Sequence, residues 1–369
     1  MMKRMFSVFV LLMVMMLAAC GVPNPSSNET SKESGSKAEP QTETKEITIA
    51  ANGGKIEKLI RDDLAPKFKE KYGITINFVA GSSNEILTKV QLQKDNPQID
   101  IAMYDSPVAV RAEEEGLTEA IAKESIKGLD SIDERYLIDE HSVPVLGYSV
   151  AVGYNTDIFK EKGWKAISSW NDLISSDYKG MTAFPDVSSN SGFTMFLSLA
   201  KANGGGIDNM QPGMDKGKEL AAYSDTFYKN STQIQPAMQQ GAAVTVQASY
   251  TIAGLHDAGV PVKMVIPKEG APLQAIVATV VKNSKNKKAA EDFINFMVTE
   301  DSQKKIAEIA FYPVVKNVKL PENYDSIIGF KDSDPVYKPD FAGIAKIQPE
   351  WTEKWTKEVT PELGKKVKK

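Results

Sequence analysis

From Glu46 onward, short apolar runs alternate with stretches in which apolar residues recur every three or four positions. The runs predict buried strands, and the longer spacing predicts amphipathic helices. The first half of this pattern gives strands at residues 47–51, 74–79 and 99–103, separated by helices at 56–72 and 84–92. Pro66 is expected to kink or restart the first helix, because proline lacks the amide proton that a helix interior needs. Strands alternating with helices in this way predict a parallel sheet with right-handed crossovers.

The longest apolar run, residues 143–155, is apolar at nearly every position and is interrupted by Gly147 and Gly153. Such a run suits a strand buried on both faces, and the glycines allow bends where two sheets meet. We interpret it as a strand that leaves one domain and enters another. The run alone leaves open the alternative of an ordinary buried strand within one domain.

The pattern after this run favours the crossing, because the alternation of strands and helices restarts. Strands are expected at 181–184, 243–247 and 262–266, and helices at 157–162, 170–174, 193–202, 213–223 and 249–255. A second long apolar run, at 275–281, is the natural return crossing. An amphipathic helix at 288–297 follows, and Trp351 and Trp355 lie four apart on one face of a C-terminal helix.

Length and composition agree with two α/β lobes. The chain has 369 residues, of which 42% are hydrophobic and 25% charged, and this is too long for a single core. We expect residues 46–146 together with 277–369 to form lobe 1, and residues 147–276 to form lobe 2. The net charge of −4 is small and gives no indication of nucleic-acid binding.

The N-terminus reads as an export and anchoring signal. Lys3 and Arg4 precede a short apolar stretch, and Leu17-Ala18-Ala19 places small residues before Cys20, the only cysteine. This resembles the lipobox of bacterial lipoproteins, which implies cleavage after residue 19 and a diacylglycerol group on Cys20. An ordinary secretory leader with an incidental cysteine is the alternative. Residues 21–45 are nearly free of large apolar side chains and predict a disordered tether.

Several short motifs, in their order and spacing, carry a wider resemblance. They are Val-Gly-Tyr-Asn-Thr-Asp-Ile-Phe at 152–159, Ser-Trp-Asn-Asp-Leu at 169–173, Ala-Lys-Ala-Asn-Gly-Gly at 200–205, Pro-Lys-Glu-Gly-Ala at 267–271, and the stretch 286–296. The chain resembles the extracellular solute-binding proteins of bacterial ABC importers, in the branch that includes spermidine/putrescine-binding proteins. The resemblance implies a periplasmic-binding-protein type II fold, with two lobes hinged on two crossing strands. It also implies a ligand in the cleft, delivery to a membrane permease, and a monomer anchored on the extracytoplasmic face of the membrane.

Catalytic alternatives find little support in the sequence. The only histidines are His141 and His256, and zinc-protease, serine-hydrolase and redox-cysteine motifs are absent from the sequence. We therefore expect no enzyme activity, no cofactor and no metal. A surface-anchored enzyme remains the alternative class, and an adhesive lipoprotein is a third.

The ligand site is expected at the carboxyl ends of the strands, where open α/β sheets bind ligands. One wall is predicted to contain Asn52, Gly53, Ser82, Ser83, Asp105 and Ser106. The other wall is predicted to contain Ser189, Asn190, Ser191, Ser249 and Tyr250. Simple helix capping is the competing role for these residue types.

The resemblance ranks a polyamine first among small polar solutes. Relatives that bind polyamines use aromatic walls and several carboxylates, because a desolvated cation needs both. This chain offers Asp105, Asp186 and Tyr250, but none of its tryptophans falls on the expected cleft loops. Serine-rich loops before helices suit a phosphonate or carboxylate group, so an aminophosphonate ranks close behind. Thiamine and ferric ion are further alternatives.

Overall fold

The computed structural model describes residues 44–367. The strands in this range are β1 (Glu46–Ala51), β2 (Thr75–Ala80), β3 (Ile101–Asp105), β4 (Val143–Asn155), β5 (Thr182–Pro185), β6 (Phe227–Tyr228), β7 (Val244–Ala248), β8 (Val262–Val265), β9 (Ala271–Val280) and β10 (Val336–Tyr337). The α-helices are α1 (Lys55–Lys58), α2 (Ala65–Tyr72), α3 (Ser83–Leu92), α4 (Ser106–Glu114), α5 (Thr156–Lys162), α6 (Asn190–Ala202), α7 (Gln211–Tyr223), α8 (Ile234–Gln239), α9 (Ser249–Asp257), α10 (Lys287–Met297), α11 (Glu300–Glu308), α12 (Glu322–Ile328) and α13 (Phe341–Glu358).

The strands follow the order β2-β1-β3-β9-β4-β7-β5-β6, with β8 paired to β4 and β10 paired to β9. Strand β1 pairs in parallel with both β2 and β3, which confirms the parallel sheet predicted for the first half of the pattern. We call the part built on β1, β2 and β3 lobe 1. Strands β5, β6 and β7 also pair in parallel, and we call the part built on them lobe 2.

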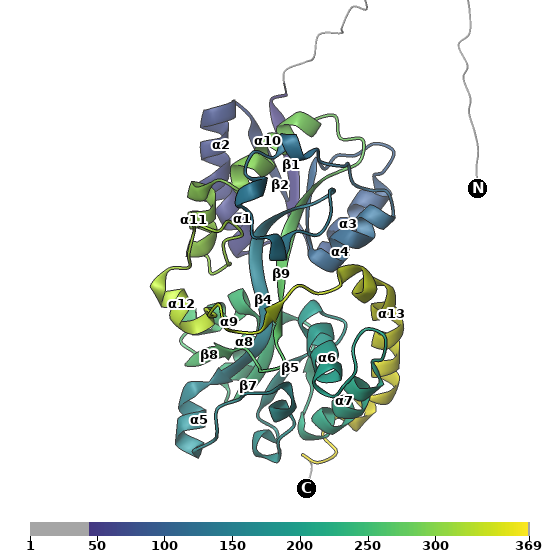
Figure 1. The fold of residues 1–369 in the computed structure, drawn as a ribbon, viewed down its shortest axis with the longest axis vertical. Helices are drawn as coiled ribbons and strands as arrows, with labels where there is room; N and C mark the ends of the chain where they lie inside the picture. The colour runs from purple at the N-terminus through teal and green to yellow at the C-terminus, as the bar shows by residue number, and fades with distance from the viewer. Residues whose placement is uncertain (1–43, 368–369) are drawn as a thin grey trace, which may run out of the picture. The chain divides into compact units, whose positions relative to one another are not determined.

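Strands β4 and β9 join the two lobes (Figure 1). Residues 143–149 of β4 pair antiparallel with β9, which itself pairs with β3 of lobe 1. Residues 150–155 of the same strand pair with β7 and β8 of lobe 2. One continuous strand, β4, therefore pairs with strands of both lobes. The two-lobed fold and its two crossing strands are confirmed.

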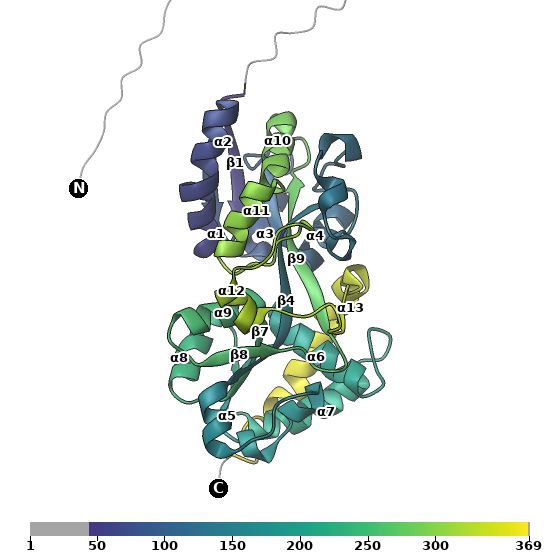
Figure 2. The same ribbon diagram turned by 60° about the vertical axis from the view of Figure 1, so that its left-hand side comes forward.

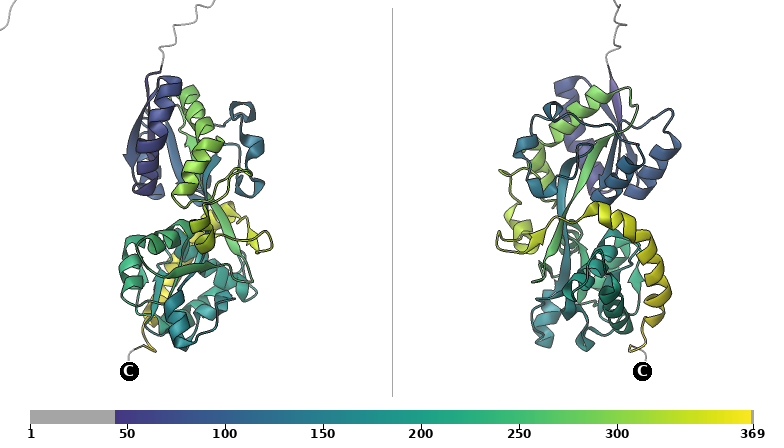
Figure 3. Two further views of the ribbon diagram at one scale, coloured as in Figure 1. Left: turned by 90° about the vertical axis from the view of Figure 1, so that its left-hand side faces the viewer. Right: turned by 45° about the vertical axis from the view of Figure 1, so that its right-hand side comes forward.

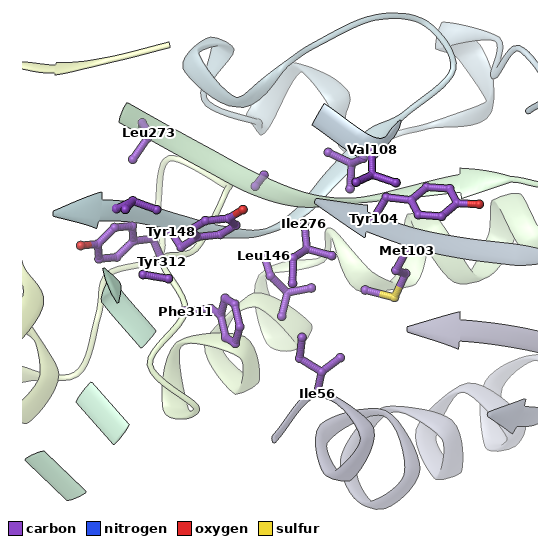
Figure 4. Packing of buried hydrophobic residues seen from close by; sticks show 14 of the residues in the cluster. Ile56, Met103, Tyr104, Val108, Leu146, Tyr148, Leu273, Ile276, Phe311 and Tyr312 are labelled. Carbon is purple, nitrogen blue, oxygen red and sulfur yellow. The ribbon is translucent and has the colours of Figure 1, made fainter. Parts of the chain in front are cut away.

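The crossing strands are held by a packed core. Leu146 of β4 is the register partner of Ile276 of β9, and both side chains are at most 2% exposed. Figure 4 shows these two side chains beside Phe311, which is also buried. Gly147 lies in the same stretch, where a Cβ would come within 2.6 Å of the Tyr136 hydroxyl oxygen. Glycine is required here because the ring of Tyr136 occupies that space.

The first long helix continues through its proline, with a π-helical segment in the turn before it. Residues after α1 form a π-helical segment, Leu59–Leu64, and α2 begins immediately afterwards with Pro66 in its first turn. Residues 55–72 are therefore one continuous helix, and the π-helical segment lies where the proline interrupts the regular hydrogen-bond pattern.

The C-terminal segment contacts both lobes. Helices α10 and α11 pack on lobe 1, where Phe293 contacts Phe68. Helix α12, however, packs on α9 and β8 of lobe 2, and α13 packs both on α4 of lobe 1 and on α7 of lobe 2. Figures 2 and 3 show α13 running along lobe 2. The predicted assignment of residues 277–369 to lobe 1 agrees with the contacts of α10 and α11 but not with those of α12, and α13 contacts both lobes.

Several element boundaries also differ from the pattern. Strand β3 begins two residues later than predicted, and α6 begins three residues earlier, at Asn190. Helix α4 follows β3 without a turn, so the apolar run hides the junction. Strands β6 and β10 have two residues each, too few to show alternation. Within residues 44–367, no helix combines the length and apolar character needed to cross a bilayer.

Candidate ligand-binding site

Two adjoining cavities lie where residues of both lobes meet. The first, which we call the α13 cavity, has a volume of about 340 Å³. It is lined by Ser82, Ser83, Asn84, Asp105, Pro107, Val108, Arg111, Ser188, Ser189, Asn190, Ala345, Gln348, Pro349 and Thr352. The second, the Tyr250 cavity, has a volume of about 270 Å³. It is lined by Ser82, Asp105, Pro185, Ser189, Asn190, Ser191, Tyr228, Lys229, Asn230, Gln247, Ala248, Tyr250 and Thr251.

Four residues line both cavities and join them into one cleft. Ser82 and Asp105 come from lobe 1, and Ser189 and Asn190 come from lobe 2. This arrangement gives the cleft one wall from each lobe, as the position of the strand ends predicts.

Both walls present the first turn of a helix. Ser82 caps α3 by accepting from the amide of Glu85, while the Glu85 carboxylate accepts from the amide of Ser82. Ser189 caps α6 by accepting from the amide of Gly192 at 3.1 Å. These serines therefore do fill capping roles, and they also line the cleft. The free amides of a first helical turn and the helix dipole favour anionic oxygen atoms nearby.

Asp105 is the most constrained polar group of the site. Ser83 Oγ donates to Asp105 Oδ2 at 2.9 Å, and Tyr148 Oη donates to Asp105 Oδ1 at 2.7 Å. Burial raises the pKa of Asp105, and the bonds from Tyr148 and Ser83 oppose that rise because they stabilise the ionised form. Asp105 therefore presents a carboxylate whose two oxygens each already accept one protein bond.

A group of aromatic rings supports the Tyr250 cavity. The ring of Tyr250 stacks on Phe311 with centroids 4.3 Å apart, and it meets the edge of Tyr148 at 5.6 Å. Burial raises the pKa of both tyrosine hydroxyls. Tyr250 therefore offers the cleft a fixed ring and a neutral hydroxyl.

Four predicted wall residues line neither cavity. Ser106 and Ser249 are fully buried; Ser106 Oγ donates to the Ala275 carbonyl, and Ser249 Oγ accepts from the Ser149 amide. Asn52 and Gly53 follow β1, which lies one strand further from the crossing strands than β3 does. These four residues therefore lie outside the two cavities. The other seven predicted residues lie at one cavity or both.

Asp186 is not one of the lining side chains, although the sequence offered it as a ligand carboxylate. Its Oδ1 accepts from the amide and the hydroxyl of Ser188, so it shapes the loop before α6. Cys20 lies outside the described residues.

The structure adds residues that the pattern did not indicate. Arg111 lies one turn along α4 from Pro107, and its Nη1 donates to Asn84 Oδ1 at 3.3 Å. Lys229 directly follows the two-residue strand β6. Gln348 and Thr352 come from α13, a helix that contacts both lobes. Helical spacing from Pro107 was the one signal that could have found Arg111.

Comparison with known proteins agrees with this architecture. Residues 63–331 match a family model described as bacterial extracellular solute-binding protein. The spermidine/putrescine-binding periplasmic protein of Salmonella typhimurium is 25% identical over 259 residues, which cover 68% of this chain and 73% of the relative. The putative 2-aminoethylphosphonate-binding periplasmic protein of Salmonella typhi is 20% identical over 307 residues, covering 78% and 80%.

A solved ABC transporter structure from Clostridium perfringens has the same fold. It superposes with a TM-score of 0.73 at 23% identity, over 85% of this chain and 99% of that one. The predicted resemblance is therefore confirmed, including its non-enzymatic character, since the family consists of binding proteins. The chain therefore belongs to the bacterial extracellular solute-binding proteins.

Proposed function

We propose that the cleft captures a small polar solute bearing an anionic group, such as a phosphonate, phosphate or carboxylate, for delivery to the permease. The observation that carries this proposal is the charge of the lining. Among the described residues that line the two cavities, the charged side chains are Arg111, Lys229 and Asp105. The lining is therefore net positive, in a chain whose net charge is −4. A positive cleft attracts and holds anions.

The same charges argue against the polyamine that the sequence ranked first. A diamine has an ammonium group at each end, and each buried ammonium needs a carboxylate partner. Asp105 could pair with one end, but the other end would then face Arg111 or Lys229. A solute with one amino group and one anionic group matches the lining better. The polyamine remains the second candidate, on the name of the Salmonella typhimurium relative.

The two helix N-termini support an anion independently of the charged side chains. The first turns of α3 and α6 both contribute to the lining of the α13 cavity, through Ser83 and Asn190. Backbone amides there would donate to oxygen atoms of a phosphonate or carboxylate.

We also propose that a lipid on Cys20 anchors the protein to the membrane. We infer it from the small residues before Cys20 and from the polar segment at 21–45. Two acyl chains on one residue give stable membrane attachment, whereas one chain does not. The segment would then act as a tether that keeps the protein near its permease.

A thermal-shift screen tests the ligand class. The panel contains 2-aminoethylphosphonate, phosphate esters, short amino acids, putrescine, spermidine, thiamine and ferric citrate. A ligand at 100 times its dissociation constant adds about 2.7 kcal/mol to the free energy of unfolding. We expect stabilisation by an anion-bearing compound and a smaller effect of putrescine or spermidine. Stabilisation by the polyamines alone would contradict the proposal.

A further inference from the structure

Tyr148 and Gln274 form a facing pair on the two strands that cross between the lobes. They are register partners in the antiparallel pairing of β4 and β9. Both are buried, with 1% of Tyr148 and 3% of Gln274 exposed, and neither lines the α13 cavity or the Tyr250 cavity. The pair therefore lies behind the site, where the chain passes from one lobe to the other.

The polar ends of this pair contact one cleft residue from each lobe. Tyr148 Oη donates to Asp105 Oδ1 of lobe 1 at 2.7 Å. Asn190 Nδ2 of lobe 2 donates to Tyr148 Oη at 3.0 Å and to Gln274 Oε1 at 2.9 Å. Asp105 and Asn190 both line both cavities. A chain of hydrogen bonds therefore runs from wall to wall of the cleft through the crossing strands.

The hydrogen-bond partners of the Tyr148 hydroxyl distinguish it from an ordinary buried tyrosine. A buried tyrosine hydroxyl needs a hydrogen-bond partner, and a backbone carbonyl is often enough, as for Tyr312, whose hydroxyl donates to the Ile328 carbonyl at 2.6 Å. The Tyr148 hydroxyl instead bonds to side chains that face the cleft. Its bonds depend on how the two walls are placed.

We propose that Tyr148 and Gln274 are positioning residues that fix the distance between Asp105 and Asn190. By fixing this distance they couple the angle between the lobes to occupancy of the cleft. The coupling to occupancy rests on the function proposed above. Rotation of one lobe about β4 and β9 would lengthen the bonds to Asp105 or Asn190. A solute that contacts both walls stabilises the same arrangement, so binding and closure favour each other.

The positioning role is tested first without any ligand. Spin labels on Lys94→Cys of lobe 1 and Lys165→Cys of lobe 2, both exposed positions, report the distance between the lobes. Cys20→Ser removes the native thiol so that only these two sites are labelled. Pulsed electron paramagnetic resonance then gives the distance distribution. We expect Tyr148→Phe to broaden or lengthen this distribution.

Two further variants make the distance measurement specific. Gln274→Leu removes the other half of the pair and is expected to have the same effect as Tyr148→Phe. Tyr154→Phe is the matched control on the same strand, since Tyr154 packs on Phe159 and lines neither cavity. An unchanged distribution in Tyr148→Phe and Gln274→Leu would overturn the proposal, even if both variants had a lower Tm.

A double-mutant cycle tests whether Tyr148 acts through Asp105. With 2-aminoethylphosphonate as the probe, loss of a bond to a charged group predicts a roughly tenfold to hundredfold weaker Kd for Tyr148→Phe. In an Asp105→Asn background the same substitution should cost much less, because its charged partner is gone. Equal losses in both backgrounds would contradict the positioning role. If the wild type binds none of the panel, the proposed ligand class fails, while the label distances still decide the role of Tyr148.

Discussion

Gly217 of α7 lies directly against the indole ring of Trp355 of α13: a Cβ at Gly217 would be 2.5 Å from Cζ3 and 2.7 Å from Cη2. Trp355 is 1% exposed, and its ring centroid lies 4.8 Å from that of Phe196 and 5.7 Å from that of Phe227. This contact fixes the C-terminal half of α13 to lobe 2. The N-terminal half packs on α4 of lobe 1, so that Gln348 reaches the cleft.

Gly217→Ala is expected to lower the free energy of unfolding by about 1–3 kcal/mol, because overpacking forces a well-packed core to shift. Chemical denaturation of both proteins measures the difference. Gly254→Ala is the matched control in a helix, since a Cβ there meets no atom within 4 Å. Removing that glycine should leave stability equal or raise it by roughly 0.4–1 kcal/mol. Equal stability of Gly217→Ala and the wild type would contradict the docking of α13.

Arg111→Gln is expected to weaken binding of an anionic ligand by about tenfold or more, since hydrogen bonds to charged groups contribute about 1.5–3 kcal/mol. Lys229→Gln should have a smaller effect, because Lys229 is exposed and solvent screens its charge. Calorimetric titration measures both. Arg61→Gln is the control: Arg61 pairs with Glu57 on lobe 1 and lines neither cavity. Normal binding by both cleft variants would place the anion elsewhere.

Asp105→Asn is expected to change the pH dependence of stability. Burial raises the pKa of Asp105 above its ordinary value of 3.8, so ionising this group in the folded protein costs free energy. The stability that the protonated form provides is complete below pH 3.8 and is lost as pH rises through the raised pKa. The gain in Tm from Asp105→Asn should therefore be larger at pH 7 than below pH 3.8. A difference in Tm that does not vary with pH would contradict this.

Cys20→Ala is expected to abolish lipid attachment and release the protein from the membrane fraction. Labelling of cells with a radioactive fatty acid, followed by fractionation, measures both effects. The wild type should be labelled and remain with the membrane. Absence of label on the wild type would favour an ordinary secretory leader.

The alternation of apolar runs and helical spacing was enough to predict the parallel sheet and both crossing strands. These features follow from local periodicity, because a strand buried on both faces has to be apolar throughout. The return of the chain to lobe 2 could not be predicted in this way. Helical spacing shows that Trp351 and Trp355 share a face, but it does not identify Gly217 of α7 as the surface against which Trp355 packs.

For the candidate site, too, the local sequence pattern predicts which residues lie near the cleft but not which way each side chain points. Seven of the eleven predicted wall residues line a cavity, because serine, asparagine and aspartate at strand ends identify the cleft edge. Ser106 and Ser249 share that position and residue type but turn into the core. Their orientation depends on backbone groups of strands that are distant in sequence. Arg111 and Lys229 were missed because the sequence does not show which charged residues face the cleft.

Calorimetric titration of the wild-type protein with 2-aminoethylphosphonate and with putrescine tests the central claim most directly. The two compounds share an amino group on a short carbon chain and differ in whether the other end is anionic or cationic. The account predicts that 2-aminoethylphosphonate binds more tightly, because the cleft lining carries two cations and one carboxylate. Tighter binding of putrescine would contradict it.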